Sequence, residues 1–285
     1  MDKTQKTHQS GTRRHYLADT ESAAELQRLV LQDAMLTDIC TPLLAPRLST
    51  VPLSILDIAC GPGIWAMRVA KAYPQSHITG TDISPCVIDY ARLTAGGDGI
   101  SNVTFTQADF YHLDQTFHQE QFDFVHVRQV LWHLGLGKEE LIRQWATLLK
   151  PGGIMRLTDW EASITNSPSF NLLTHYLKQA LHAYKRSDSE YCVGIVYQLF
   201  PLLRQASFSQ IVEQPHYVNF SAGTDFHDVY IQDITQGAIA LEKFIVGSGK
   251  VDCDTYRACL RESIKEIDSP DFLGGHFFLS VWGVK

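Results

Sequence analysis

The feature that most constrains this chain is a run of small residues, LDIACGPGIWA, at residues 56–66. An apolar segment typical of a buried strand leads into this run, and a helical apolar pattern begins within it. The spacing of Gly61, Gly63 and Ala66 fits the pattern G-x-G-x-x-G/A, which lets a strand-to-helix turn approach a nucleotide closely. The run therefore predicts an α/β fold with a ligand at the end of its first strand.

Strand-like and helix-like segments alternate along the part of the chain that contains this run. Such alternation is typical of a doubly wound parallel sheet, in which ligands bind at the carboxyl ends of the strands. Two later strands bring the predicted sheet to seven strands, most of them parallel. The predicted strands lie at residues 53–59, 77–83, 102–109, 122–130, 153–160, 209–220 and 274–285, and predicted helices lie at 63–74, 84–95 and 138–149.

The chain is expected to divide into three parts. Residues 1–48 form an N-terminal tail and a helix, residues 49–161 form the ligand-binding core, and residues 162–285 complete the sheet. The last part also carries two helical segments, at about 162–206 and 225–267. Because insertions of this length usually carry function, we expect these segments to form a cap over the substrate.

Charge and composition restrict the partners of such a fold. The 285 residues carry a net charge of −7, which argues against a nucleic acid as partner. No apolar run approaches the roughly 18 residues that span a membrane, and the polar N-terminus lacks a signal-peptide core. Six scattered cysteines without a C-x-x-C pair indicate reduced thiols and a cytoplasmic location. The twelve histidines show no metal-ligand spacing, so no metal is expected.

Two acidic residues favour one kind of nucleoside ligand. Asp82 lies nineteen residues after Gly63, at a strand end where a carboxylate can accept hydrogen bonds from two ribose hydroxyls. Asp57 lies just before the turn, where a carboxylate repels a pyrophosphate and attracts a cation. S-adenosylmethionine has no phosphate and carries a sulfonium and an ammonium, so it fits better than a dinucleotide. The alternatives are that Asp57 caps the following loop and that Asp82 interacts with the next helix N-terminus.

These segments together resemble the class I S-adenosylmethionine-dependent methyltransferases, particularly those that act on small molecules. The resemblance covers roughly residues 16–161 and is carried by LDIACGPG (56–63), GTDIS (80–84), QADF (107–110), FDFVHVRQVLWHL (122–134) and LKPGGIMRLTDWE (149–161). One such motif is weak, whereas five in this order are a strong signal. The departure is Ala59, where the family usually has glycine. The resemblance implies a Rossmann-like fold with a helical N-terminal lid and a helical cap.

The resemblance assigns one group of residues to the methionine end of S-adenosylmethionine. The turn from Asp57 to Gly63, which includes Ala59 and Gly61, would hold this end of the cofactor. The backbone around Arg128, at the end of the fourth predicted strand, would face the same moiety. The alternative for Arg128 is a solvated residue at a strand end. S-adenosyl-L-homocysteine is the expected product.

A second group of residues is assigned to the adenosine end. Asp82 would hold the ribose, and Ile83 would pack on the adenine. Asp109 would accept a hydrogen bond from the adenine amino group, and Phe110 would lie beside the ring. Tyr16 would fold over the sulfonium as part of the lid. Asp109 could instead be a loop acid, and Tyr16 could instead lie on a tail helix that packs on the sheet edge.

Methyl transfer requires alignment of the nucleophile, the methyl group and sulfur, and exclusion of water. A hydroxyl acceptor would also benefit from a general base, whereas an amine or an activated carbon needs none. His133, Asp159 and Glu161 follow the fourth and fifth predicted strands and are the candidates for this base. His133 is preferred, and its alternative is a histidine without catalytic role at a helix start.

The expected reaction is methyl transfer to an O, N or C atom of a small to mid-sized organic acceptor in secondary metabolism. Aromatic residues of the cap are expected to line an apolar pocket for this acceptor, and the protein is expected to be a monomer or a homodimer. Three alternatives remain: a cofactor-binding protein that catalyses a non-methylating step such as a cyclisation, an NAD-dependent oxidoreductase, and a regulatory protein without activity. Product mass separates the first and an NAD titration tests the second, while intact Gly61, Gly63, Asp82 and Asp109 argue against the third.

Overall fold

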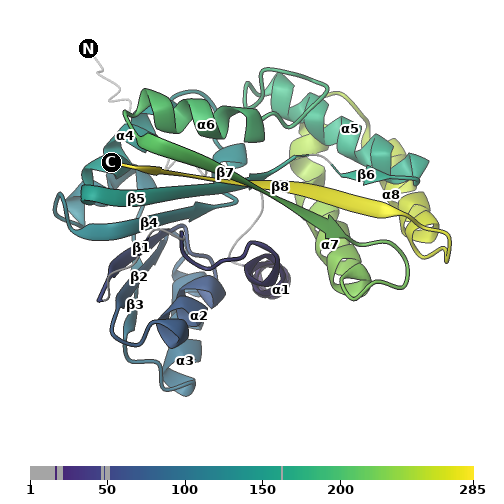
Figure 1. Cartoon of the computed structure of the whole chain (residues 1–285). Helices are drawn as coiled ribbons and strands as arrows, with labels where there is room; N and C mark the ends of the chain where they lie inside the picture. Colours follow the sequence, from purple (N-terminus) through teal and green to yellow (C-terminus); the bar gives the residue numbers. More distant parts are fainter. Residues whose placement is uncertain (1–16, 18–21, 46–47, 49–51, 162) are drawn as a thin grey trace, which may run out of the picture.

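The computed structural model describes residues 17, 22–45, 48, 52–161 and 163–285 (Figure 1). The strands are β1 Ser54–Ile58, β2 His77–Asp82, β3 Val103–Gln107, β4 Phe122–Arg128, β5 Leu149–Trp160, β6 Ile164–Thr165, β7 Ser209–Asn219 and β8 Gly274–Val284. The α-helices are α1 Ala23–Ile39, α2 Ile64–Ala72, α3 Pro85–Gly97, α4 Lys138–Thr147, α5 Pro168–Ala183, α6 Val196–Gln205, α7 His227–Gly247 and α8 Cys253–Ile267. Two short 3₁₀-helices, η1 Phe110–Gln115 and η2 Leu131–His133, follow β3 and β4.

The strands form one sheet in the order β3-β2-β1-β4-β5-β8-β6, with β7 paired to β8. The first five strands are parallel, whereas β8 runs antiparallel to β5, β6 and β7. The doubly wound, mostly parallel sheet predicted from the sequence is therefore confirmed. It has eight strands rather than the seven predicted, because β6 has only two residues and leaves no periodic pattern.

Parallel pairing brings the carboxyl ends of the first strands to one edge of the sheet. Ile58 lies opposite Thr81 of β2 and Val127 of β4, and Asp82 lies opposite Gln107 of β3. The segments that follow these four strands consequently start side by side. In doubly wound sheets this edge is the place where ligands bind.

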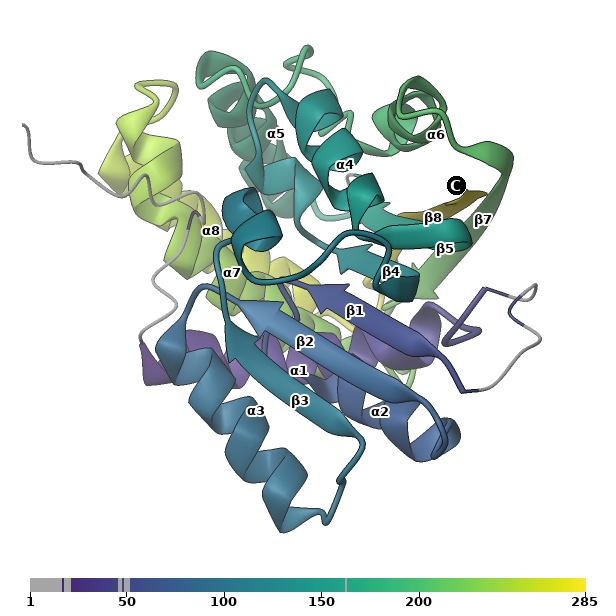
Figure 2. The same cartoon turned by 90° about the vertical axis from the view of Figure 1, so that its left-hand side faces the viewer.

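Helices cover both faces of the sheet, as the continuous apolar strands require. Ile55 packs into a buried cluster with residues of α2 and α3, and its neighbour Leu56 packs into another cluster with residues of α4 and α6. Neighbouring residues of a strand face opposite sides, so the two clusters lie on opposite faces. Figure 2 shows α2 and α3 on one side of β1–β3 and α4 on the other.

The second half of the chain places its helices in two different locations. Helices α5, α7 and α8 contact one another beside the part of β8 that extends beyond β5, and α1 contacts α7 (Figure 1). Helix α6 instead packs on the sheet against α4, β5, β7 and β8. The segment 162–206, expected from the sequence to cap the substrate, is thus split between these two locations.

Candidate functional site

A cavity of about 530 Å³ lies at the carboxyl ends of the strands, next to helices α1, α5 and α7. The segments after the strands contribute Asp57, Ala59, Cys60, Gly61, Asp82, Ile83, Asp109, Phe110, Arg128 and His133 to its lining. The helices contribute a mainly apolar set that includes Leu29, Leu36, Phe170, Leu173, Leu177, Tyr230, Ile234 and Leu241. Most residues that the sequence assigned to a cofactor therefore share one cavity with a separate apolar region.

The turn after β1 has a left-handed backbone at three positions. The φ angles are 54° at Ala59, 55° at Gly61 and 77° at Gly63, so alanine keeps the turn despite a cost of about 1–2 kcal/mol. A Cβ on Gly63 would lie 2.5 Å from Cε1 of Phe105, so only glycine lets the turn pack on β3. A Cβ on Gly61 would meet no atom within 4 Å. Gly61 lines the cavity and leaves room for a ligand, while Gly63 supports the turn from behind.

The carboxylate of Asp82 lines the cavity and also fastens the turn. Its Oδ2 accepts a hydrogen bond from the backbone N–H of Gly61 at 3.1 Å, and its Oδ1 accepts one from Ser84 at 3.0 Å. Ser84 in turn is the N-cap of α3 and accepts from Val87 N at 3.3 Å. Asp82 therefore interacts with the next helix start, as its alternative interpretation expects. Each carboxylate oxygen has two lone pairs, so a ligand hydroxyl can still bind.

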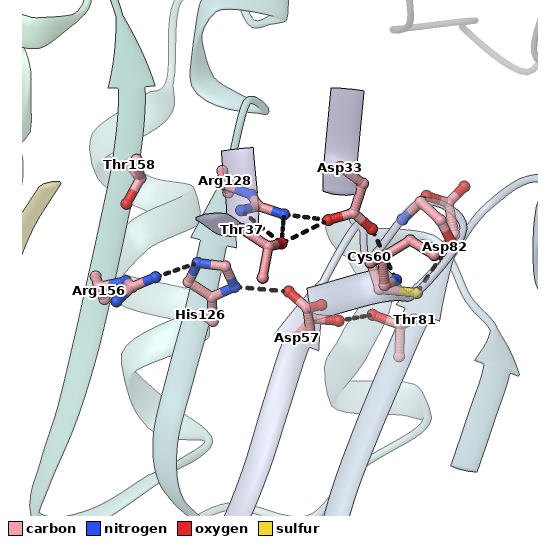
Figure 3. A network of polar contacts seen from close by, with 12 residues as sticks. Asp33, Thr37, Asp57, Cys60, Thr81, Asp82, His126, Arg128, Arg156 and Thr158 are labelled. Carbon is pink, nitrogen blue, oxygen red and sulfur yellow. Dashed lines mark hydrogen bonds and ion pairs between the residues drawn. The ribbon is translucent and has the colours of Figure 1, made fainter. Parts of the chain in front are cut away.

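Asp57 is held by a chain of hydrogen bonds that crosses three neighbouring strands (Figure 3). Nδ1 of His126 lies 2.9 Å from Oδ1 of Asp57, and Nη2 of Arg156 lies 3.2 Å from Nε2 of His126. A guanidinium group can only donate, so the imidazole proton must be on Nδ1 and points to Asp57. The carboxylate is thus bound within the sheet and does not cap the following loop.

Burial shifts the pKa values of the three side chains in this hydrogen-bond network. It lowers the pKa of His126 well below its usual value and that of Arg156 to about 10, and it raises the pKa of Asp57 well above the usual range. At neutral pH the imidazole is therefore uncharged and the guanidinium is charged. The nearby positive charges of Arg128 and Arg156 lower the pKa of Asp57 and oppose the effect of burial.

Arg128 connects the end of β4 with helix α1 (Figure 3). Its Nη2 forms an ion pair with Oδ1 of Asp33, and its Nη1 lies 3.2 Å from Oγ1 of Thr37. The other oxygen of Asp33 accepts from the backbone N–H of Ile64 at 2.8 Å, at the start of α2. The Arg128 side chain is therefore partnered and nearly buried, and the alternative of a solvated strand end is wrong.

The residues assigned to the adenine lie after β2 and β3. Ile83 is 48% exposed and lines the cavity, which leaves its side chain free to pack on a flat ring. Asp109 accepts from the backbone N–H of Tyr111 at 3.0 Å and so caps η1. The ring centroid of Phe110 is 4.6 Å from that of Tyr111 and 6.0 Å from that of Trp145. Capping by Asp109 is the loop role that its alternative interpretation expects, although the residue also lines the cavity.

Of the three candidate bases, only His133 is among the described residues that line the cavity. Its ring is 6% exposed and lies 3.8 Å from that of Trp132. Burial lowers its pKa well below the usual value, so the imidazole is uncharged at neutral pH. Asp159 accepts hydrogen bonds from three backbone N–H groups, two of them in η2. Glu161 accepts from two backbone N–H groups in the loop before α6.

A buried charged group joins α1 to α7 at the cavity wall. Nη1 of Arg28 is 2.7 Å from Oδ1 of Asp233, and its Nη2 is 2.7 Å from Oε1 of Glu25. Gln32 donates to both oxygens of Asp233 at 3.2 Å. All four residues line the cavity. Helices α1 and α7 are therefore joined directly at the cavity wall.

Several residues of the site escape the sequence analysis. Arg28, Asp33 and Asp233 meet their partners only through the fold, and their spacing carries no motif. His276, on β8, also lines the cavity. Only His126 and His276 could have been found, because a histidine in an apolar strand is unusual. Tyr16 lies outside the described residues.

The described part of the chain shows no metal site, membrane-spanning helix or disulfide. Its histidines, cysteines and acids form no group of three or more that could hold a metal ion. None of its helices combines the length and apolar character needed to cross a membrane. The six cysteines are all free thiols.

Comparisons with known proteins place these features in a family. Residues 55–153 match the model of a family described as a methyltransferase domain. The methyltransferase str3 of Strobilurus tenacellus is 33% identical over 136 residues, which are 48% of this chain and 46% of that protein. An uncharacterized protein of Rickettsia prowazekii is 28% identical over 148 residues, 47% of this chain and 58% of that protein. This chain thus spans about half the length of these curated relatives.

One solved structure supports the fold. The crystal structure of the YcgJ protein from Bacillus subtilis matches 91% of this chain and 98% of its own chain, with a TM-score of 0.54 and 17% sequence identity. At this level of identity the likeness concerns the fold alone.

Proposed function

We propose that this chain, whose residues 55–153 match a methyltransferase-domain family, is a class I S-adenosylmethionine-dependent methyltransferase that transfers a methyl group to a small or mid-sized organic acceptor. The observation that carries the proposal is the cavity in which the glycine turn, three strand-end carboxylates and an apolar region meet. The nucleophile is an oxygen, nitrogen or carbon atom, and we assign the acceptor to secondary metabolism. The free thiols are compatible with a reducing, cytoplasmic location, which we also propose. We further propose that the protein is a monomer or a homodimer.

The residues present fit S-adenosylmethionine better than a dinucleotide. Gly61 lines the cavity and has no side chain, so a cofactor can approach the backbone of the turn there. Asp57, Asp82 and Asp109 all line the same cavity, and such a group of acids would repel a pyrophosphate. S-adenosylmethionine has a positive charge and no phosphate, so the same acids would attract it.

The two ends of the cofactor would be held by different strand ends. Asp82 would accept hydrogen bonds from the ribose hydroxyls, because it lines the cavity at the end of β2, beside the glycine turn. Ile83 and Phe110 would pack on the adenine, and Asp109 would accept from its amino group. The turn from Ala59 to Gly63 and the backbone at Arg128 would face the methionine end.

Asp57 would attract the cationic methionine tail, and its neighbours would keep it in place. The bond from His126 fixes one carboxylate oxygen, while Arg156 fixes the tautomer of His126. Burial favours the neutral form of Asp57, and a cation bound beside the carboxyl group would lower its pKa and favour the ionised form. His126 and Arg156 are therefore positioning residues for this contact.

When bound, S-adenosylmethionine would supply an electrophilic methyl group. The chain contributes alignment and a dry site, which together can account for about 7–11 kcal/mol of the barrier. The apolar wall from α1, α5 and α7 would shield a bound acceptor from water on that side. His133, uncharged at neutral pH, would take the proton from a hydroxyl acceptor.

A screen of product masses tests the proposal. The purified chain is first saturated with S-adenosylmethionine, and occupancy is measured by native mass spectrometry. It is then incubated with an acceptor library, and products are examined by mass. We expect one or more acceptors to gain the mass of one CH₂ group, together with release of S-adenosylhomocysteine. Conversion of an acceptor without a change in mass would favour a cyclisation or isomerisation, and failure to bind the cofactor would refute the proposal.

A further inference from the structure

His276 lies in the apolar part of the cavity, far from the glycine turn in sequence. It is 8% exposed, comes from β8 and belongs to the cavity lining. Its ring centroid is 5.2 Å from that of Trp160, 5.6 Å from Tyr230 and 4.5 Å from Phe278. An imidazole within such an aromatic cluster is a polar group that needs partners for both nitrogens.

One nitrogen of His276 has a partner, and this partner determines the tautomer. Nε2 lies 2.5 Å from the backbone carbonyl oxygen of Glu161. A carbonyl oxygen only accepts hydrogen bonds, so Nε2 carries the proton. Burial lowers the pKa of His276 to about 3, so the ring stays neutral at physiological pH. Nδ1 is consequently a lone-pair acceptor.

Nδ1 of His276 has no hydrogen-bond partner among the residues that the structure describes. The same holds for Nε1 of Trp132, a pure donor that also lines the cavity, and the rings of Trp132 and Trp160 are 5.4 Å apart. A buried polar atom without a partner costs about 1–3 kcal/mol, and folded proteins rarely leave one unpaired. Two of them on one cavity wall indicate that a ligand supplies the missing partners.

The charges of the lining restrict what this ligand can be. The described lining contains two basic side chains, Arg28 and Arg128. Both are ion-paired with acids of the same cavity, so neither is available to bind an anionic ligand. An acceptor that carries a phosphate or carboxylate would be repelled, whereas an uncharged one would not.

We propose that the methyl acceptor is an uncharged, largely apolar molecule that donates a hydrogen bond from a hydroxyl or N–H group to Nδ1 of His276. The proposal rests on the methyltransferase function inferred above and names the acceptor class for that site. His276 thereby selects acceptors by the presence of a donor group, and Trp132 offers a donor to an oxygen or nitrogen lone pair on the same molecule. The apolar body fills the space between α1, α5 and α7.

Three probes with the same aromatic body test the proposal. Binding of 2-naphthol, 2-methoxynaphthalene and 2-naphthyl phosphate is measured by calorimetry in the presence of S-adenosylhomocysteine, which has no methyl group to transfer. We expect 2-naphthol to bind about tenfold more tightly than 2-methoxynaphthalene, which lacks the donor. The phosphate should bind least of the three.

Two variants assign the preference to one nitrogen. His276→Gln keeps an N–H for the carbonyl of Glu161 but has no acceptor at the place of Nδ1, so the tenfold preference should vanish. His276→Asn keeps an acceptor there and should retain most of it. Circular dichroism of both variants checks that they fold.

Each remaining outcome decides against the proposal. Equal affinity of the wild type for naphthol and methoxynaphthalene, tightest binding of the phosphate, or no binding of any probe would overturn it. So would an unchanged preference in His276→Gln. A separate titration with S-adenosylmethionine distinguishes this failure from failure of the proposed function, because cofactor binding would persist if only the acceptor class is wrong.

Discussion

The Asp57 carboxylate is oriented by residues that lie outside its own sequence motif. Its type and place before the turn are visible in the sequence, and they predict a cationic ligand. Its orientation depends on His126 and Arg156, which reach it only because β1, β4 and β5 are neighbours. Roles that depend on local spacing, such as those of Gly61 and Asp82, can thus be predicted, whereas partners brought by pairing cannot.

Ala59 should be a strained position. Because its φ of 54° is left-handed, Ala59→Gly should raise the free energy of unfolding by about 1 kcal/mol, measured by urea denaturation. The control Ala66→Gly removes a buried methyl from helix α2 and should lower it by a similar amount or more. A loss of stability in Ala59→Gly would contradict the strained turn.

The two glycines of the turn should respond differently to an added methyl group. Gly63→Ala should lower the free energy of unfolding by about 3 kcal/mol, because its Cβ would collide with Phe105. Gly61→Ala should cost about 1 kcal/mol of stability but weaken S-adenosylmethionine binding at least about tenfold. Denaturation and calorimetry on both variants measure these effects. Full cofactor affinity in Gly61→Ala would show that the ligand does not approach the turn there.

Asp159 should make stability depend on pH. Burial outweighs its three backbone hydrogen bonds and raises its pKa from 3.8 to about 7, so the folded chain holds a proton that the unfolded chain releases. This contribution is complete below pH 4 and is lost as the pH rises to 7. The wild type should therefore lose about 2–3 kcal/mol relative to Asp159→Asn between pH 5 and pH 8 in urea denaturation. A constant difference over this range would be the contrary result.

At the scale of elements, local signals account for most helices and strands but not for their contacts. Ser84 and Pro85 mark the start of α3 in the sequence, and the apolar strands are recognisable from their residue types. The split of the segment 162–206 was not predictable, because the amphipathic patterns of α5 and α6 indicate a buried face but not which elements that face packs against. The contact of α1 with α7 joins residues 205 positions apart and leaves no local signal.

The tie between α1 and α7 should contribute strongly to stability. Asp233→Ala removes one partner of a buried ion pair and should lower the free energy of unfolding by about 3 kcal/mol. The exposed pair of Glu262 and Lys265 on α8 serves as control, since Glu262→Ala should cost less than about 1 kcal/mol. Similar effects of both substitutions in thermal or urea denaturation would show that the buried pair does not hold the two helices together.

At the scale of the whole molecule, the site is a composite. The strand ends supply the polar residues for a cofactor, and helices from both ends of the chain supply the apolar wall for an acceptor. The polar residues at the strand ends lie in motifs that are visible in the sequence. The apolar wall depends on how α1, α5, α7 and β8 come together, so the place of His276 in the cavity emerges only from the fold.

Calorimetric titration with S-adenosylmethionine tests the central claim most directly. The wild type should bind one molecule of S-adenosylmethionine per chain and give no heat with NAD. Asp82→Asn should weaken cofactor binding by about 1–3 kcal/mol, because it leaves ribose hydroxyls without a full set of partners. Absence of binding to the wild type, or tighter binding of NAD, would contradict the account.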